Sequence, residues 1–215
     1  MEPCSGRATE GVAGHRDQAG EPMETFDFLD QVMTLFGDLT DGTAEDRLDD
    51  PTPCDEWKVR HLLGHAIGAA YVYANVMQGT NEMVPGSTPP DLDRLGSLVG
   101  ENHRAAVRGA FAHLRDAGGA VDDLDAPAST FWAEGSLDWV LRMWANDFLV
   151  HCWDLATATG QDLAVPDDLA QAGLDLSYDY VVEVSRPAGR VSPATEVGDG
   201  ATTFERLVTH YGRSL

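Results

Sequence analysis

Basic residues are scarce in this sequence: 14 lysines and arginines stand against 36 aspartates and glutamates, giving a formal net charge of -22. Lys58 is the only lysine among the 215 residues. Nucleic acids and anionic membrane surfaces are bound mainly through clustered lysine and arginine side chains. The composition therefore argues against both of these partners and favours a small molecule or another protein.

Cysteines are few and long apolar runs are absent. The three cysteines, Cys4, Cys54 and Cys152, show no C-x-x-C spacing, and a small odd number is typical of a reducing cytosol. The first 20 residues are polar and lack the apolar segment of a secretory signal. No apolar run is long enough to cross a bilayer. We therefore expect a cytoplasmic protein, either a monomer or a homodimer.

Apolar residues recur at helical spacing along most of the chain, which predicts a single all-α domain over residues 23–215. Residues 1–22 are polar and glycine-rich and predict a flexible N-terminal tail. We find no internal repeat and no domain-breaking linker. The expected helices, separated by loops that contain proline and glycine, cover residues 23–36, 56–78, 91 or 97 to 117, 137–160, 166–184 and 203–211.

Local signals refine the ends of these helices. Gly37 is expected to interrupt the first helix, Asp55 to cap the second, and Ser136 to cap the helix over 137–160. The linker over 79–95 has the length of a crossover between helices that point the same way. In the loop before the helix over 137–160, we expect Phe131 and Trp132 to form a lid or a pocket wall.

The helix over 137–160 contains an anomaly that points to chemistry. Asp147, His151 and Asp154 are spaced i, i+4, i+7, so they share one face, and that face is the middle of the apolar stripe. Burying such groups without partners costs on the order of several kcal/mol. A bound metal would compensate, because an acid and a histidine four residues apart can both reach one ion. The alternative is an Asp–His hydrogen bond that only orders the core.

The helix over 56–78 offers a histidine for the same site. His61 and His65 are four residues apart, but His65 lies inside the apolar arc beside Ala69 and Val72, whereas His61 leans toward the polar stripe. His65 is therefore the inward candidate, and His61 is expected at the surface or rim. The remaining candidates are interpreted as ordinary residues: Cys54 as a packed side chain rather than a reactive thiol, and His15, His103 and His113 as surface or boundary histidines.

Three segments together resemble a known family: PTPCDEWKVRHLLGHAIG, DFLVHCWDLATATG and DGATTFERLVTHYGRSL. They are similar to the DinB-like, mycothiol-dependent maleylpyruvate isomerase superfamily, and the third resembles the closing segment of an actinobacterial metal-binding subgroup. The resemblance covers roughly residues 25–215. It implies an up-down-down-up four-helix bundle with a short C-terminal extension and a divalent ion, zinc or nickel, at one end of the core.

The family's metal ligands are one histidine on the second helix and an acid plus a histidine on the later helix. Carried over, they are His65, Asp147 and His151, although the family usually has glutamate where Asp147 stands. The shorter side chain is expected to change the affinity and the identity of the bound metal more than the location of the site. Asp154 is expected to orient a ligand from outside the site, to act as a cap partner at the end of the helix, or to become a fourth ligand.

The resemblance implies a divalent-metal-dependent isomerase or thiol transferase that acts on a small molecule with mycothiol as thiol cosubstrate. Two alternatives stay open: a biosynthetic tailoring enzyme that uses the same pocket for a cyclisation or addition without thiol, and a non-catalytic metal-binding protein. Three nitrogen and oxygen ligands would leave coordination positions open for water and substrate, as in catalytic sites. The scarcity of basic residues offers no obvious clamp for a dicarboxylate, which argues against maleylpyruvate itself as the substrate.

Overall fold

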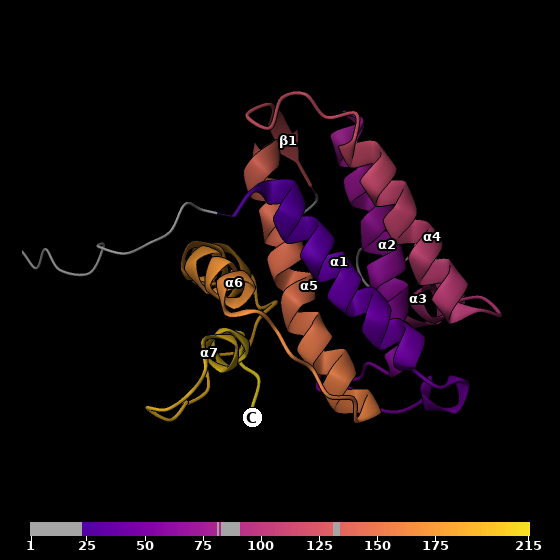
Figure 1. Cartoon of the computed structure of the whole chain (residues 1–215), viewed down its shortest axis with the longest axis vertical. Coiled ribbons are helices and arrows are strands. Elements are labelled where there is room, and N and C mark those ends of the chain that lie inside the picture. Colours follow the sequence, from indigo (N-terminus) through magenta and orange to yellow (C-terminus); the bar gives the residue numbers. More distant parts are fainter. Residues whose placement is uncertain (1–22, 81, 83–90, 131–133) are drawn as a thin grey trace, which may run out of the picture.

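The computed structural model describes residues 23–80, 82, 91–130 and 134–215 (Figure 1). Four long helices form a bundle: α1 (Thr25–Gly42), α2 (Val59–Met77), α4 (His103–Gly118) and α5 (Leu137–Thr159). Within the described residues the only sheet is a short hairpin of β1 (Pro127–Ser129) and β2 (Glu134–Ser136). The predicted all-α class is confirmed. The expected tail over 1–22 and the aromatic residues Phe131 and Trp132 lie outside the described residues.

Contacts at the helix ends give the direction of each helix. Near their starts, α1 and α5 are joined by a hydrogen bond from Thr25 to Asp138, and near their ends Gln161 donates to the Leu39 carbonyl at 2.9 Å. These two helices therefore run the same way. α4 runs opposite to them, because Arg104 at its start donates to the Asp41 carbonyl at the end of α1, at 2.9 Å.

The end of α2 lies at the same end of the bundle as the end of α4. A Cβ placed on Gly118 would lie 3.0 Å from the ring of Phe26 and 3.8 Å from the sulfur of Met77. α2 and α4 therefore run parallel to each other and antiparallel to α1 and α5, as Figure 1 shows. This confirms the up-down-down-up arrangement and the expected crossover between α2 and α4.

The region before α4 differs from the prediction of one helix from 91 or 97 to 117. It contains α3 (Leu92–Leu98) and α4, separated by Gly100 at φ 56°. α3 packs closely on α2, because a Cβ on Gly64 would stand only 1.9 Å from the Leu95 carbonyl oxygen. Asn102 then caps α4 by accepting from the Ala105 N–H at 3.0 Å.

Three local expectations have different outcomes. α1 continues through Gly37 to Gly42, so the predicted interruption is wrong; the buried face of α1 outweighs the roughly 1 kcal/mol that a glycine costs inside a helix. The N-cap of α2 is Lys58 and not Asp55, because Glu56 adopts φ 63° in a tight turn before the helix. Ser136 caps α5 as predicted, accepting from the Trp139 N–H at 3.2 Å.

The C-terminal part of the chain packs beside α5. Gly160, at φ 68°, ends α5, and α6 (Asp167–Tyr180) follows and continues as the single π-helical turn η2 (Val181–Ser185). α7 (Thr203–His210) contacts both α6 and α5, and Figure 1 shows α6 and α7 on the side of α5 away from α2 and α4. The helices expected over 166–184 and 203–211 are thus present. A short 3-10 turn, η1 (Glu45–Arg47), lies between α1 and α2.

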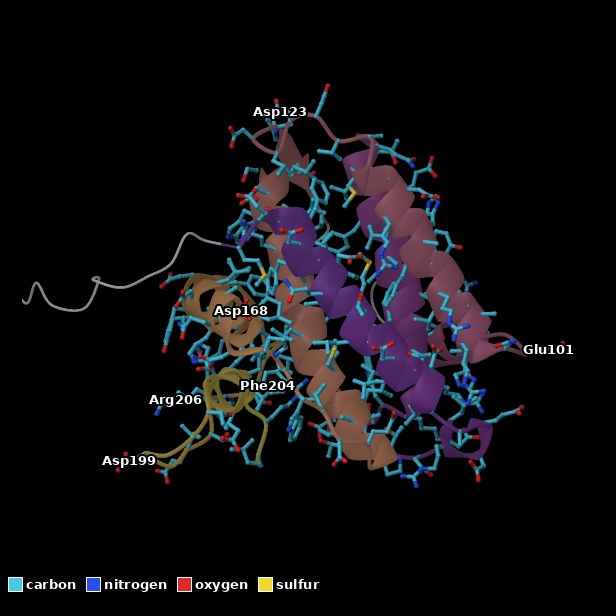
Figure 2. The ribbon with its side chains drawn as sticks, viewed as in Figure 1. Glu101, Asp123, Asp168, Asp199, Phe204 and Arg206 are labelled. Atoms are coloured by element: carbon cyan, nitrogen blue, oxygen red, sulfur yellow. The ribbon has the colours of Figure 1, made fainter. Side chains whose placement is uncertain are left out.

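Apolar and aromatic side chains fill the centre of the bundle. Phe36 of α1 contacts Phe111 of α4 and Phe148 of α5 edge to face, with ring centroids 5.9 and 5.7 Å apart. The acidic residues labelled in Figure 2, among them Glu101, Asp123 and Asp199, lie at the periphery of the molecule. In the described part of the chain, no helix combines the length and apolarity needed to span a membrane.

Candidate metal site

A cavity of about 990 Å³ opens between the bundle and the C-terminal segment. Its walls come from the loop before α2, from α2 and α5, and from residues 180–193 and 211–213. All three predicted metal ligands line it: His65 from α2, and Asp147 and His151 from α5. The helical-wheel argument that chose His65 over His61 therefore selected the histidine that reaches this cavity.

The three side chains converge on one point. His65 Nε2 lies 3.7 Å from Asp147 Oδ2, and His151 Nε2 lies 3.6 Å from the same oxygen. One ligand atom from each residue lies within 4.8 Å of the other two. Two donors bound tetrahedrally to zinc at about 2.1 Å would be about 3.4 Å apart. The spacing and the N,N,O donor set therefore fit a divalent cation.

Two of these ligands have pKa shifts that suit metal binding. Burial lowers the pKa of His65, whose ring stacks on Phe148 and meets the edge of Trp57, both at 5.2 Å. A neutral imidazole keeps the lone pair that a metal needs. Burial acts to raise the pKa of Asp147, but His151 and His65 outweigh it, so the pKa of this carboxyl lies below its usual value.

His151 has the opposite shift. Burial alone would lower its pKa, but the carboxylates of Asp147 and Asp154 raise the pKa to about 10. The imidazole thus takes up a proton where the surroundings are anionic, and a divalent ion bound there would supply the same positive charge. His151 Nδ1 lies 2.8 Å from Asp154 Oδ2, which leaves Nε2 for the cavity.

Asp154 is fully buried and bound from several sides. Arg213 donates to it in a bidentate fork, Nε to Oδ1 at 2.8 Å and Nη2 to Oδ2 at 2.7 Å. The Cys54 thiol donates to Oδ2 at 3.2 Å. Burial would raise the pKa of Asp154, but Arg213 and His151 hold it well below the usual range of a carboxyl group. Asp154 is therefore an ionised acceptor that fixes the orientation of the His151 ring.

Residues 29–156 match the family described as the mycothiol maleylpyruvate isomerase N-terminal domain. This chain belongs to that family. Two proteins of Mycobacterium tuberculosis are each 31% identical to it over 140 residues, 65% of this chain and 70% of the relative. They are named "Uncharacterized protein MT0763" (strain CDC 1551 / Oshkosh) and "Uncharacterized protein Rv0738" (strain ATCC 25618 / H37Rv).

Solved structures of the mycothiol-dependent maleylpyruvate isomerase share the fold. One aligns with a TM-score of 0.58 at 13% identity and covers 70% of this chain and 68% of that chain. A histidine-to-alanine mutant of the same enzyme aligns over the same shares with a TM-score of 0.58 at 12% identity. At this level of identity the likeness shows the fold alone.

Arg213 lies beyond the residues that match the mycothiol maleylpyruvate isomerase family, and the sequence reasoning missed it. Gly212, at φ 80°, brings the chain close to residues 192–193: a Cβ there would be 2.7 Å from the Ser192 Cβ. This close approach, which only glycine permits, places the Arg213 guanidinium against Asp154. The one feature of the sequence that could have pointed to Arg213 was a glycine–arginine pair after a short helix. This pair does not identify the residue that the arginine contacts.

Cys54 occupies a more polar position than the predicted packed side chain. Its thiol, which forms no disulfide, is half-buried, lines the cavity and contacts Asp154 and Arg213, the latter at 3.5 Å. The position comes from a tight turn in which the Trp57 N–H donates to the Cys54 carbonyl at 3.0 Å. Cys54, His151 and Asp154 thus form a second group whose ligand atoms lie within 4.8 Å of one another.

The other histidines that the structure describes lie away from the candidate ligands. His61 Nδ1 accepts from the Lys58 N–H at 3.2 Å at the start of α2, in agreement with the expected rim position. The His113 ring lies beside that of Tyr71, with ring centroids 5.0 Å apart and the ring planes tilted by 37°. His103 is buried, with Nε2 3.1 Å from the Thr43 carbonyl, so the expectation of a surface or boundary residue is wrong there.

The expectation that the chain offers no basic clamp does not hold. Three arginines line the cavity: Arg186, Arg190 and Arg213. They come from a segment that has weak helical periodicity and follows the family-matched residues, so sequence spacing could not place them. The argument from missing basic residues against maleylpyruvate as the substrate therefore loses its basis.

Proposed function

We propose that this chain is a divalent-metal-dependent enzyme of the mycothiol-dependent isomerase or thiol-transferase type that acts on a small molecule. Zinc is the favoured ion and nickel the second choice, because two imidazoles and a carboxylate suit both. The observation that carries the proposal is the convergence of His65, Asp147 and His151 on one point of an open cavity. When bound, the ion polarises a substrate oxygen or lowers the pKa of a thiol or water.

The chain's own residues have definite roles in this proposal. Three protein ligands leave coordination positions open toward the cavity, as in catalytic rather than structural sites. Asp154 and Arg213 hold the Nδ1 side of His151, so Nε2 is the nitrogen presented to the ligand. The aromatic rings of Trp57 and Phe148 flank the two histidines and limit the access of water.

The size of the cavity supports two small ligands. Sites for single small molecules usually span about 300–1,000 Å³, and this cavity of about 990 Å³ lies at the upper limit. It therefore has room for a substrate and for a low-molecular-weight thiol beside it. Membership of the mycothiol maleylpyruvate isomerase family favours mycothiol as that thiol.

Turnover measured with and without thiol tests the proposal. The zinc-loaded protein is incubated with a panel of electrophilic small molecules, with mycothiol present or omitted, and the products are separated by chromatography. We expect turnover that requires mycothiol and is lost in His65→Ala and His151→Ala. His61→Ala is the matched control, since His61 lies one turn from His65 but outside the cavity lining.

Other outcomes would favour the alternatives. Turnover that is indifferent to mycothiol but lost in His65→Ala would favour a tailoring enzyme that uses the same pocket. Zinc binding without turnover of any substrate in the panel would favour a metal-binding protein. If His65→Ala and His61→Ala behaved alike in both zinc content and turnover, the proposed site would be wrong.

A further inference from the structure

Aromatic side chains form much of the wall of the cavity at the candidate metal site. Those that line it are Trp57, Tyr73, Trp144, Phe148, Tyr180 and Tyr211. All but the first are buried, none with more than 6% of its surface exposed, whereas Trp57 is half-buried. Among the described residues that line the cavity, Trp57 is therefore the aromatic residue with ring surface left for a ligand.

The buried rings are already packed against one another. Phe148 stacks on both His65 and Trp144, with ring centroids 5.2 and 4.7 Å apart. Trp144 also contacts the rings of Tyr73 and Phe111, at 5.8 and 6.3 Å. These rings therefore form the core behind the cavity and do not offer a free face to a ligand.

The Trp57 ring lies beside two of the candidate metal ligands. It is nearly parallel to the His151 ring, at 18° with centroids 6.2 Å apart, and it meets His65 edge to face at 5.2 Å. A centroid separation of 6.2 Å is typical of offset rings, so His151 covers only part of the indole face. A ligand at the open coordination positions of these histidines would thus lie next to the indole.

A strained turn holds Trp57 in this place. Glu56, at φ 63°, is the only residue other than glycine with a positive φ in the described part of the chain. Thr52 fixes the turn, because its N–H and its hydroxyl both donate to the Trp57 carbonyl at 2.9 Å. Such backbone strain costs free energy and is concentrated at active sites and ligand clamps. The turn therefore favours a role for Trp57 beyond covering the core.

We infer that Trp57 is a stacking platform, and that the substrate of this cavity carries a planar aromatic ring bound against the indole. The inference rests on the proposed function in that the bound molecule is taken to be the substrate. Offset-stacked aromatic pairs gain free energy beyond that of the area they bury. The indole therefore favours a flat aromatic ring over an aliphatic group of similar size.

The charges around the cavity disfavour an organic cation, the other kind of group that binds to an indole face. Three arginines and two aspartates line the cavity, and a divalent ion at the proposed site would add two positive charges. A cationic ligand beside Trp57 would be repelled by this excess of positive charge. The cavity volume of about 990 Å³ leaves room for a ring system as large as a fused bicycle of carbons.

Calorimetric titration with matched ring compounds tests the inference. The full-length protein, zinc-loaded and after chelation, is titrated with naphthol and with its saturated analogue decahydronaphthol, which keeps the hydroxyl but has no aromatic ring. We expect both forms of the protein to bind naphthol roughly two- to tenfold more tightly than decahydronaphthol. Trp57→Leu should abolish this preference, whereas Trp57→Phe should keep part of it. Trp153→Leu is the matched control and should keep all of it, because Trp153 is also half-buried but lies outside the cavity lining.

Fluorine NMR keeps the inference testable if Trp57→Leu fails to fold. In protein grown with fluorinated tryptophan, the signal that is missing from Trp57→Phe belongs to Trp57. We expect naphthol to shift this signal through the ring current of the stacked ligand, and decahydronaphthol to shift it much less.

A purely structural role for Trp57 gives a different result, because Trp57→Leu would then weaken both compounds by the same factor and leave the preference unchanged. That result would overturn the inference. It is also overturned if wild-type protein does not bind naphthol, if naphthol and decahydronaphthol bind alike, or if the two compounds shift the Trp57 signal equally.

The two proposals fail separately. If the protein takes up no zinc but prefers naphthol in a Trp57-dependent way, the stacking platform stands and the metal-dependent function is wrong. If zinc binds at His65, Asp147 and His151 but naphthol is not preferred, the platform is wrong and the proposed function stands.

Discussion

Removal of Arg213 should weaken both the fold and the metal site. In Arg213→Met the carboxylate of Asp154 loses its bidentate partner, while the Asp154 side chain is 0% exposed and the Arg213 side chain 17% exposed. Removing one partner of a buried ion pair typically costs about 3–5 kcal/mol. Asp154 would keep only His151 and the Cys54 thiol, so its hold on the His151 ring would loosen. Loss of a hydrogen-bond partner that orients a metal ligand typically lowers metal affinity about 10–100-fold.

Two assays measure these effects. Urea denaturation of the chelated protein gives the change in the free energy of unfolding, and competition with a zinc chelator gives the change in affinity. Arg142→Met is the control, because Arg142 also pairs with an aspartate of α5, Asp138 at 3.1 Å, and is similarly shielded at 21% exposure. It should lose stability without losing zinc affinity.

A double-mutant cycle isolates the interaction between the two residues. Asp154→Asn removes the charge that Arg213 neutralises, so Arg213→Met should cost much less in the Asp154→Asn background than in the wild type. If the two substitutions were additive, or if Arg213→Met bound zinc as tightly as Arg142→Met, the reasoning about the His151–Asp154–Arg213 chain would be refuted.

Two further predictions concern Asp147 and the close helix contact at Gly64. Asp147→Asn should lower zinc affinity at least tenfold because an uncharged amide replaces the carboxylate ligand, whereas Asp147→Glu should retain binding; equal affinities by chelator competition would contradict this. Gly64→Ala should cost about 1–3 kcal/mol in urea denaturation, because its Cβ would meet the Leu95 carbonyl at 1.9 Å. Gly109→Ala on α4, where nothing lies within 4 Å of the added Cβ, should instead stabilise the fold by about 0.5–1 kcal/mol. If both substitutions changed the free energy of unfolding alike, the close approach of Gly64 to Leu95 would not be what determines the cost.

The bundle and the inward side chains could be predicted because both follow from helical periodicity. Spacing alone separates His65 from His61 and stacks Asp147 on His151, since residues three or four apart share a face. The division between α3 and α4 was missed because it depends on the left-handed backbone at Gly100, which a periodic apolar pattern does not reveal.

The outer parts of the site could not be predicted, because they depend on tertiary contacts. Arg213 reaches Asp154 across 59 residues, and Arg186 and Arg190 meet the cavity from a turn after η2. No sequence spacing connects such residues to α5. His103 is a second example: it is buried, with its ring nitrogen beside the Thr43 carbonyl, and this tertiary position cannot be predicted from helix position alone.

X-ray absorption spectroscopy of the zinc-loaded protein tests the central claim most directly. Two groups of side chains compete for an ion in this region, and they share His151: one adds His65 and Asp147, the other Cys54 and Asp154. Zinc–nitrogen and zinc–oxygen distances are about 2.0–2.2 Å, whereas a zinc–sulfur distance is about 2.3 Å. The account predicts two imidazoles, oxygen ligands and no sulfur in the coordination shell. A sulfur ligand from Cys54, or a protein that takes up no zinc, would contradict it.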